Sequence, residues 1–172
     1  MQAITGGEFG HYMRTFETSA FRLEQQPGYA VDYEAEQFAA FRAGDVRDPR
    51  EMPEFAAWLP TVAQYLAEGR RIERVRIHQV PPTDYQRWTR YVGQWNVEAG
   101  EVIHYATVDQ AQQVGLLPEA GPYDWWLLDD ARILRMTFDE DNVCIARHLL
   151  TDEASLERAR TWRELAIRAA GG

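Results

Sequence analysis

Apolar side chains recur at helical spacing through the first part of the chain. The pattern predicts a first helix that ends near residues 26–28 and a second helix that stops at Gly44. Pro53 suits the first turn of a third helix, and Gly69 suits its end. The sequence therefore predicts an N-terminal helical segment over residues 6–68.

Alternation of apolar and polar residues, which is typical of strands, takes over in the second part of the chain. The predicted strands cover residues 72–80, 101–108, 124–128, 132–138 and 143–150. Thr83 and Gln86 have the spacing of a capping box, which predicts a helix between the first two strands. A short helix is expected over residues 109–114, and Thr151 is expected to cap a last helix.

These elements predict an α/β (α+β) fold in a single globular domain, residues 1–172. The helical segment is expected to pack on the α/β part, residues 70–170. The sheet is expected to be mixed, with about five strands: a β-α-β unit, then an antiparallel meander, between helices at both ends of the chain. Trp125 and Trp126 must point to opposite faces of their strand. Either helices cover both faces of the sheet, or one tryptophan is exposed and available to contact a ligand or partner.

Composition narrows the range of functions. The formal net charge is −9, which argues against direct binding to nucleic acid, because a phosphate backbone requires a basic surface. All eighteen basic residues are arginines, which excludes a Schiff-base lysine or a phosphate-loop lysine. The single cysteine, Cys144, excludes an internal disulfide and a cysteine-based zinc cluster. Without an apolar leader after Met1 or an apolar stretch of bilayer length, we expect a cytoplasmic protein without membrane contact.

Three basic side chains share one face of the strand predicted over residues 72–80. Val75 and Ile77 alternate with Arg74, Arg76 and His78. One interpretation is an anion-binding floor, since guanidinium groups bind carboxylates and phosphates through paired hydrogen bonds. The other interpretation is that the arginines pair with local carboxylates or that this face is solvated.

Histidines fall on three of the predicted strands, at His78, His104 and His148. If they converged on one sheet, they could bind a metal or transfer protons. Their spacing matches no metal-binding motif, and the sequence alone does not place them together. The prediction is therefore that the chain has no metal site and no cofactor.

Acidic residues supply a second set of candidates. Asp129 and Asp130 end the strand predicted over residues 124–128, where a pair of carboxylates could hold Mg²⁺ or act as acid and base. The same two residues are also typical of a hairpin turn. Asp84, in the first turn of the capped helix, would complete an acidic set.

The chain resembles an uncharacterised actinobacterial family, a domain of unknown function found largely in Streptomyces and relatives. The residues that carry the resemblance are 20–24 (AFRLE), Tyr29, Glu34, Arg76, 83–88 (TDYQRW), 99–101 (AGE), 124–130 (DWWLLDD) and 136–139 (MTFD). The resemblance implies a gene neighbourhood with helix-turn-helix regulators of the WhiJ-like type. The order of the predicted strands is also similar to one half of a phospholipase-D-like domain. The His-x-Lys motif of those enzymes is missing, so that likeness implies a scaffold without their catalysis.

Three hypotheses follow. In the first, the chain is a regulatory or sensor module that binds a helix-turn-helix regulator or a small anionic ligand, through Arg76, His78 and the end of the capped helix that carries Tyr85 and Arg87. In the second, it is a small enzyme of specialised metabolism or phosphoester hydrolysis. Asp84, Asp129 and Asp130 would then act as acid/base or Mg²⁺ groups in one pocket, and Arg76 would hold the anion. In the third, it is a homodimer with an apolar patch around Trp125 or Trp162.

Overall fold

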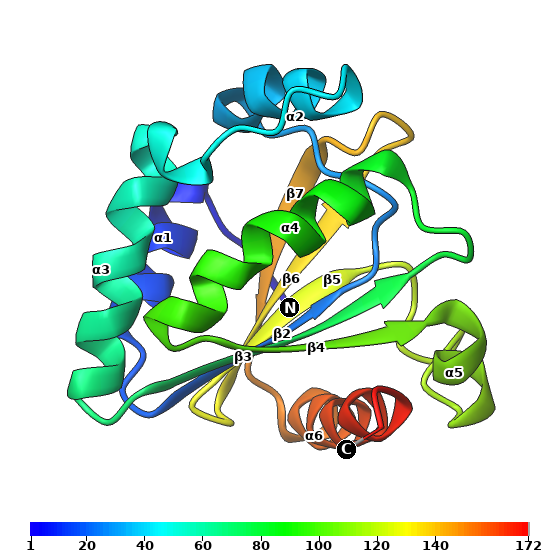
Figure 1. The fold of residues 1–172 in the computed structure, drawn as a ribbon. Helices are drawn as coiled ribbons and strands as arrows, with labels where there is room; N and C mark the ends of the chain where they lie inside the picture. Colours follow the sequence, from blue (N-terminus) through cyan, green and yellow to red (C-terminus); the bar gives the residue numbers. More distant parts are fainter. Residues whose placement is uncertain (172) are drawn as a thin grey trace.

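A mixed sheet of seven strands divides the molecule into two helical layers (Figure 1). The computed structural model describes residues 1–171. Its elements are β1 (Gln2–Ala3), α1 (Gly6–Thr15), β2 (Ser19–Glu24), η1 (Asp32–Glu34), α2 (Ala35–Arg42), η2 (Pro49–Glu51), α3 (Pro53–Ala67), β3 (Arg71–His78), α4 (Asp84–Ala99), β4 (Val102–Thr107), α5 (Val108–Gln113), β5 (Asp124–Leu128), β6 (Arg132–Phe138), β7 (Cys144–Leu150) and α6 (Glu153–Ala169). The predicted single-domain α+β class is confirmed, with seven strands in place of about five.

The strand order is β1-β7-β6-β5-β2-β3-β4. The strands β2, β3 and β4 are parallel, and β2 also pairs with the antiparallel meander through β5. This order places β2 at the junction of the parallel and antiparallel halves. Side chains from both halves of the chain therefore lie next to one another around β2.

The predicted first helix is wrong beyond Thr15. The helix α1 ends there, and Ser19–Glu24 forms the strand β2 instead. Phe16 and Ala20 are buried and have spacing that suits a helix, but Phe21 and Leu23 are buried on the other face of the strand. A short apolar run does not distinguish helix from strand, and pairing with β3 and β5 decides the matter here.

Capping residues define where several helices begin. Thr83 and Gln86 form the predicted capping box of α4, and Pro53 occupies the first turn of α3. The predicted cap of α6 is wrong by one residue, because Asp152 rather than Thr151 accepts the hydrogen bond from the backbone N–H of Ser155, at 2.9 Å. Asp is also preferred over Thr at the residue before the first helical turn.

Helices cover both faces of the sheet (Figure 1). Trp125 is buried under α6, where its ring packs against Trp162 at 6.3 Å, while Trp126 is buried on the face of α1, α3 and α4. This confirms the interpretation in which both tryptophans are covered. Trp125 is only 2% exposed, so it does not form the apolar surface patch expected for a dimer.

The short connections between the meander strands are hairpin turns. Asp129 and Asp130 both have positive φ, 54° and 53°, at the two central positions of a turn that the Ala131 N–H closes on the Leu128 carbonyl at 3.0 Å. Asn142 at φ 62° ends the second turn. Among residues 1–171, no helix has both the length and the apolar character needed to cross a bilayer.

Candidate functional site

Two rows of side chains cross the central sheet on the face that carries α1, α3 and α4. The register of the strands aligns Trp126 with Arg22 and Arg22 with Arg74, which makes the first row. One pleat further along, Glu24 is aligned with Arg76 and Arg76 with Tyr105. Because β2 and β3 are parallel and in register, charged residues about fifty positions apart become neighbours.

Glu24 is the centre of an ion-pair network that we call the arginine floor, made of Arg22, Arg74 and Arg76 with their carboxylate partners. One Glu24 carboxylate oxygen lies 3.0 Å from Arg22 Nη1 and 2.9 Å from Arg74 Nη1, and the other lies 2.5 Å from Arg76 Nε. Glu24 is only 7% exposed. A buried carboxylate is costly unless cations compensate it, and here three do.

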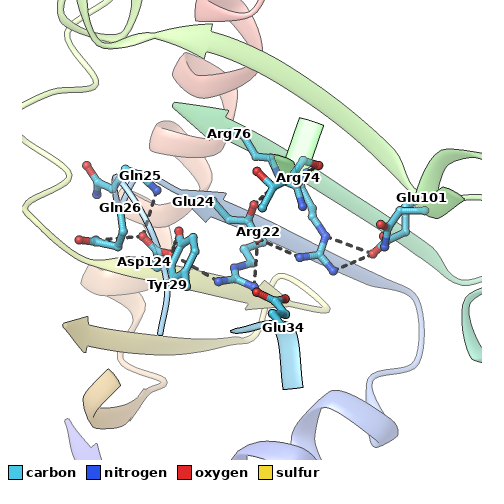
Figure 2. Close-up of polar contacts among 12 residues, drawn as sticks. Arg22, Glu24, Gln25, Gln26, Tyr29, Glu34, Arg74, Arg76, Glu101 and Asp124 are labelled. Carbon is cyan, nitrogen blue, oxygen red and sulfur yellow. Dashed lines mark hydrogen bonds and ion pairs between the residues drawn. The ribbon is translucent and has the colours of Figure 1, made fainter. Parts of the chain in front are cut away.

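Two more carboxylates complete the floor. Glu101 accepts from Arg74 Nε at 3.1 Å and from Nη2 at 2.8 Å, a paired contact from a single guanidinium. Asp124 lies 3.4 Å from Arg22 and accepts a hydrogen bond from the hydroxyl of Tyr29. Figure 2 shows Arg22 between the Tyr29–Asp124 pair on one side and the Arg74–Glu101 pair on the other. Three arginines thus face three carboxylates.

Trp126 contacts two guanidinium groups of the floor. Arg22 and Arg74 lie 5.4 Å and 5.0 Å from the centre of its ring. Contacts of this kind favour arginine over other cations, because the flat guanidinium stacks on the ring and still donates at its edges. The tryptophan therefore packs against both arginines while they pair with their carboxylates.

Burial and charge set the protonation of the floor. Burial would raise the pKa of Glu24, but the guanidiniums of Arg22, Arg76 and Arg74 outweigh it and lower that pKa well below its ordinary value. Burial raises the pKa of Asp124, and burial together with the charge of Asp124 raises that of Tyr29. Glu24 is therefore a permanent carboxylate at neutral pH.

Arg76 is held from two sides. It donates to Glu24 and also, through Nη1, to the backbone carbonyl of Thr89 in α4 at 3.0 Å. Gly93 makes this approach possible, since a Cβ at that position would lie 3.0 Å from Arg76 Nη1 and from the Tyr105 hydroxyl. The helix α4 therefore packs directly against the row of Glu24, Arg76 and Tyr105.

A cavity of about 760 Å³ opens above the arginine floor. This volume is within the range of small-molecule sites. Arg22, Glu24, Arg74 and Arg76 are among the residues that line it. Its walls are rich in aromatic rings, which include those of Phe9, Tyr29, Phe55, Trp58, Tyr85 and Trp126.

Three polar groups on the walls have distinct chemistry. His78 has its pKa lowered to about 4, first by burial and then by the cations Arg76 and Arg90, so its imidazole is neutral at pH 7. Glu34, in η1, accepts a hydrogen bond from the Tyr85 hydroxyl at 2.5 Å, and burial raises its pKa. Cys144, the only cysteine of the chain, also lines the cavity and is half-buried.

The structure brings together some of the predicted site residues. Arg74, Arg76, His78 and Tyr85 all line the cavity. The pairing of Arg74 and Arg76 with local carboxylates is the arrangement observed. The predicted open anion floor differs from this arrangement, because all three side-chain nitrogens of Arg74 and two of the three of Arg76 already donate to protein acceptors.

The other predicted residues lie elsewhere. Asp84 and Arg87 form an exposed ion pair at the start of α4, and Arg87 also donates to the carbonyl of Pro82 at 2.7 Å. His104, on the opposite face of the sheet, contacts Glu73 at 2.8 Å. The register places His148 on that opposite face too, on β7, five strands from β4. Within residues 1–171, no three His, Cys, Asp or Glu side chains form a group that could hold a metal.

Asp129 and Asp130 have structural partners. Asp129 Oδ1 accepts from the backbone N–H groups of Thr18 at 2.8 Å and of Glu17 at 3.0 Å, next to the start of β2. Asp130 contacts Arg163 of α6 at 2.5 Å. Asp84 lies near the other end of β2, where Thr83 bonds to Pro27. The three carboxylates of the enzyme hypothesis therefore do not share a pocket.

A comparison with models of known protein families identifies the family of this chain. Residues 7–171 match the family described as "Domain of unknown function (DUF6879)". The chain belongs to this family. No curated protein matches it.

Sequence reasoning missed the central residues of this DUF6879 site. Arg22, Glu24 and Glu34 fall in predicted helices, and Asp124 is assigned at most to closing the loop before its strand; the family resemblance includes all four but implies no site role for them. The run Phe21-Arg22-Leu23-Glu24 has the same alternation as Val75-Arg76-Ile77-His78. That alternation is the signal that could have identified β2 as a strand with a charged face.

Proposed function

We propose that this DUF6879 chain is a regulatory module that senses a small molecule in the cavity above the arginine floor and works with a helix-turn-helix transcriptional regulator. The cavity carries the proposal. It combines a volume of about 760 Å³, aromatic walls and a base of fixed charges. Ligand sites typically have this composition, with mostly apolar walls and a few oriented polar groups.

The fixed orientation of the floor also supports ligand binding. Arg22, Arg74 and Arg76 are each held by a carboxylate, and two of them are stacked on Trp126. Groups held in this way lose little conformational freedom when a ligand arrives, which favours affinity. A purely structural core would fill this volume with side chains.

The regulatory part of the proposal rests on family resemblance and charge. The family resemblance implies genes beside WhiJ-like helix-turn-helix regulators of actinobacteria. A formal net charge of −9 suits contact with a basic DNA-binding partner and disfavours direct contact with DNA. Ligand binding would then change the affinity of the chain for that partner.

Cys144 allows a site-specific test of the cavity. We expect 8-anilinonaphthalene-1-sulfonate, an aromatic anion, to bind the purified protein with increased dye fluorescence. Labelling the thiol with N-phenylmaleimide fills part of the cavity and should weaken dye binding about tenfold or more. The variant Cys144→Ser, treated with the same reagent, should bind the dye as the untreated protein does.

Two results would count against the cavity as a ligand site. One is the absence of dye binding at micromolar protein concentration. The other is equal dye binding by the labelled and unlabelled protein, since the dye would then lie outside the cavity.

The partner is tested separately. A helix-turn-helix regulator of the WhiJ-like type is purified and titrated with this protein by calorimetry, with and without the dye in the cavity. We expect micromolar or tighter binding that weakens with added salt, because the proposed contact joins opposite charges. Lack of binding under all these conditions would remove the regulatory part and leave the ligand site.

A further inference from the structure

The arginine floor is neutral as a unit. The positive charges of Arg22, Arg74 and Arg76 are matched by Glu24, Asp124 and Glu101, all within 3.4 Å of a guanidinium nitrogen. A ligand that carried only negative charge would have to compete with these carboxylates for the same donors. Charged residues of the cavity outside the floor are therefore the ones that can select a charged ligand.

Glu34 is a half-buried carboxylate of the cavity wall that makes no direct ion pair among residues 1–171, and Arg76 and Arg22 act on it only at longer range. It accepts a hydrogen bond only from a neutral group, the hydroxyl of Tyr85, at 2.5 Å. The ring of Tyr85 in turn packs edge-on against Tyr29, with centres 5.7 Å apart. A carboxylate beside electron-rich rings is the usual environment for an ammonium group.

Arg147, on β7, is a half-buried cation that lines the same cavity. Its guanidinium lies 5.8 Å from the centre of the Phe9 ring, and within the described part of the chain it pairs with no carboxylate. The stacked guanidinium keeps its edge donors free, which is the arrangement that accepts a carboxylate through two hydrogen bonds.

We propose that the cavity binds a small zwitterion of the amino-acid type, with its ammonium group at Glu34, its carboxylate at Arg147 and its side chain against the aromatic wall. This inference rests on the proposed ligand-sensing function and names the class of ligand. These two half-buried charges without an ion pair line one cavity from different elements and do not pair with each other, so a molecule that carries both opposite charges satisfies both.

Three chemically matched probes separate the two charges. L-Phenylalanine carries both groups, 3-phenylpropionate lacks the ammonium group, and 2-phenylethylamine lacks the carboxylate. Affinity is measured at pH 7.5 by displacement of 8-anilinonaphthalene-1-sulfonate and by calorimetry. Slower reaction of Cys144 with a thiol reagent shows whether the probe occupies the cavity. We expect L-phenylalanine to bind about tenfold or more tightly than either analogue, because each buried charge-assisted contact is worth at least that factor.

Two variants assign the charges to residues. Glu34→Gln should weaken L-phenylalanine and 2-phenylethylamine about tenfold and leave 3-phenylpropionate unchanged. Arg147→Gln should weaken L-phenylalanine and 3-phenylpropionate and leave 2-phenylethylamine unchanged. Glu36→Gln is the matched control, since Glu36 is exposed on α2 and pairs with Arg47 outside the cavity. Unchanged binding of the insensitive probe also shows that each variant is folded.

The outcomes distinguish this inference from the function on which it rests. If the dye occupies the cavity but L-phenylalanine binds no better than its two analogues, the zwitterion is refuted and the ligand site stands. The same holds if Glu34→Gln and Arg147→Gln affect all three probes equally. If the dye itself does not enter the cavity, both proposals fail.

Discussion

Replacing the central carboxylate of the arginine floor tests how the fold tolerates its buried charges. The substitution Glu24→Gln keeps the size of the side chain and removes its charge. Arg74 retains Glu101, and Arg22 retains Asp124. Arg76 retains only neutral neighbours, the carbonyl of Thr89 at 3.0 Å and the hydroxyl of Tyr105. The variant therefore leaves one buried cation without a counter-ion.

The cost follows from that single unmatched charge. Breaking a buried ion pair on one side costs about 3–5 kcal/mol, because the remaining charge stays desolvated. The three contacts of Glu24 do not add up to three times this amount, since two of the arginines keep a second carboxylate. We expect Glu24→Gln to lower the free energy of unfolding by about 4 kcal/mol. A domain of ordinary stability, about 5–15 kcal/mol, remains folded after such a loss.

Urea denaturation followed by circular dichroism and tryptophan fluorescence measures this difference. The matched control is Glu153→Gln, which breaks a 2.7 Å ion pair with Arg160, in which the side chain of Glu153 is 68% exposed. That control should cost at most about 1 kcal/mol. Adding Arg76→Gln to Glu24→Gln removes the unmatched cation and should not destabilise the protein further. If Glu24→Gln costs no more than Glu153→Gln, the role assigned to the floor is wrong.

Three further predictions concern other parts of the structure. Because the pKa of His78 is lowered to about 4 in the folded protein, the unfolded chain binds a proton at higher pH than the folded one does. The contribution of His78 to the free energy of unfolding is therefore complete above about pH 6.5 and falls by up to about 3 kcal/mol as the pH drops to 4. The variant His78→Gln should reduce this decline in urea titrations at a series of pH values. Gly100 has φ of 118°, and a Cβ at this position would lie 2.7 Å from the side chain of Leu66. Gly100→Ala should therefore lower the urea midpoint by the equivalent of about 1–3 kcal/mol. An unchanged midpoint would contradict the positive φ assigned to Gly100. Burial would raise the pKa of Asp129, but the backbone N–H groups of Thr18, Glu17 and Ser19 outweigh it and lower that pKa. Asp129→Ala should therefore cost about 2–3 kcal/mol in thermal unfolding, and Asp129→Asn less, because Asn keeps an acceptor and tolerates positive φ.

Local sequence determined the elements whose signals are short-range. The capping box of Thr83 and Gln86 places the start of α4, since both hydrogen bonds form within one turn. The alternation around Arg74 and Arg76 correctly divides β3 into an apolar and a charged face. Asp129 and Asp130 form the turn that their residue type favours, because the positive φ of a tight hairpin suits Asp. These features depend on residues at most a few positions apart.

The tertiary structure decided which residues make the site. Residues 19–24 alternate as a strand does over too short a run to exclude a helix, and the pairing with β3 and β5 decides for the strand. That pairing places Glu24 within 3.0 Å of three arginines, two of them about fifty positions further along the chain. Glu34 and Arg147 are more than a hundred positions apart and line one cavity because the fold brings η1 and β7 to the same face of the sheet. The sequence determined the faces of the individual elements, and the order of strands in the sheet determined which charged side chains meet.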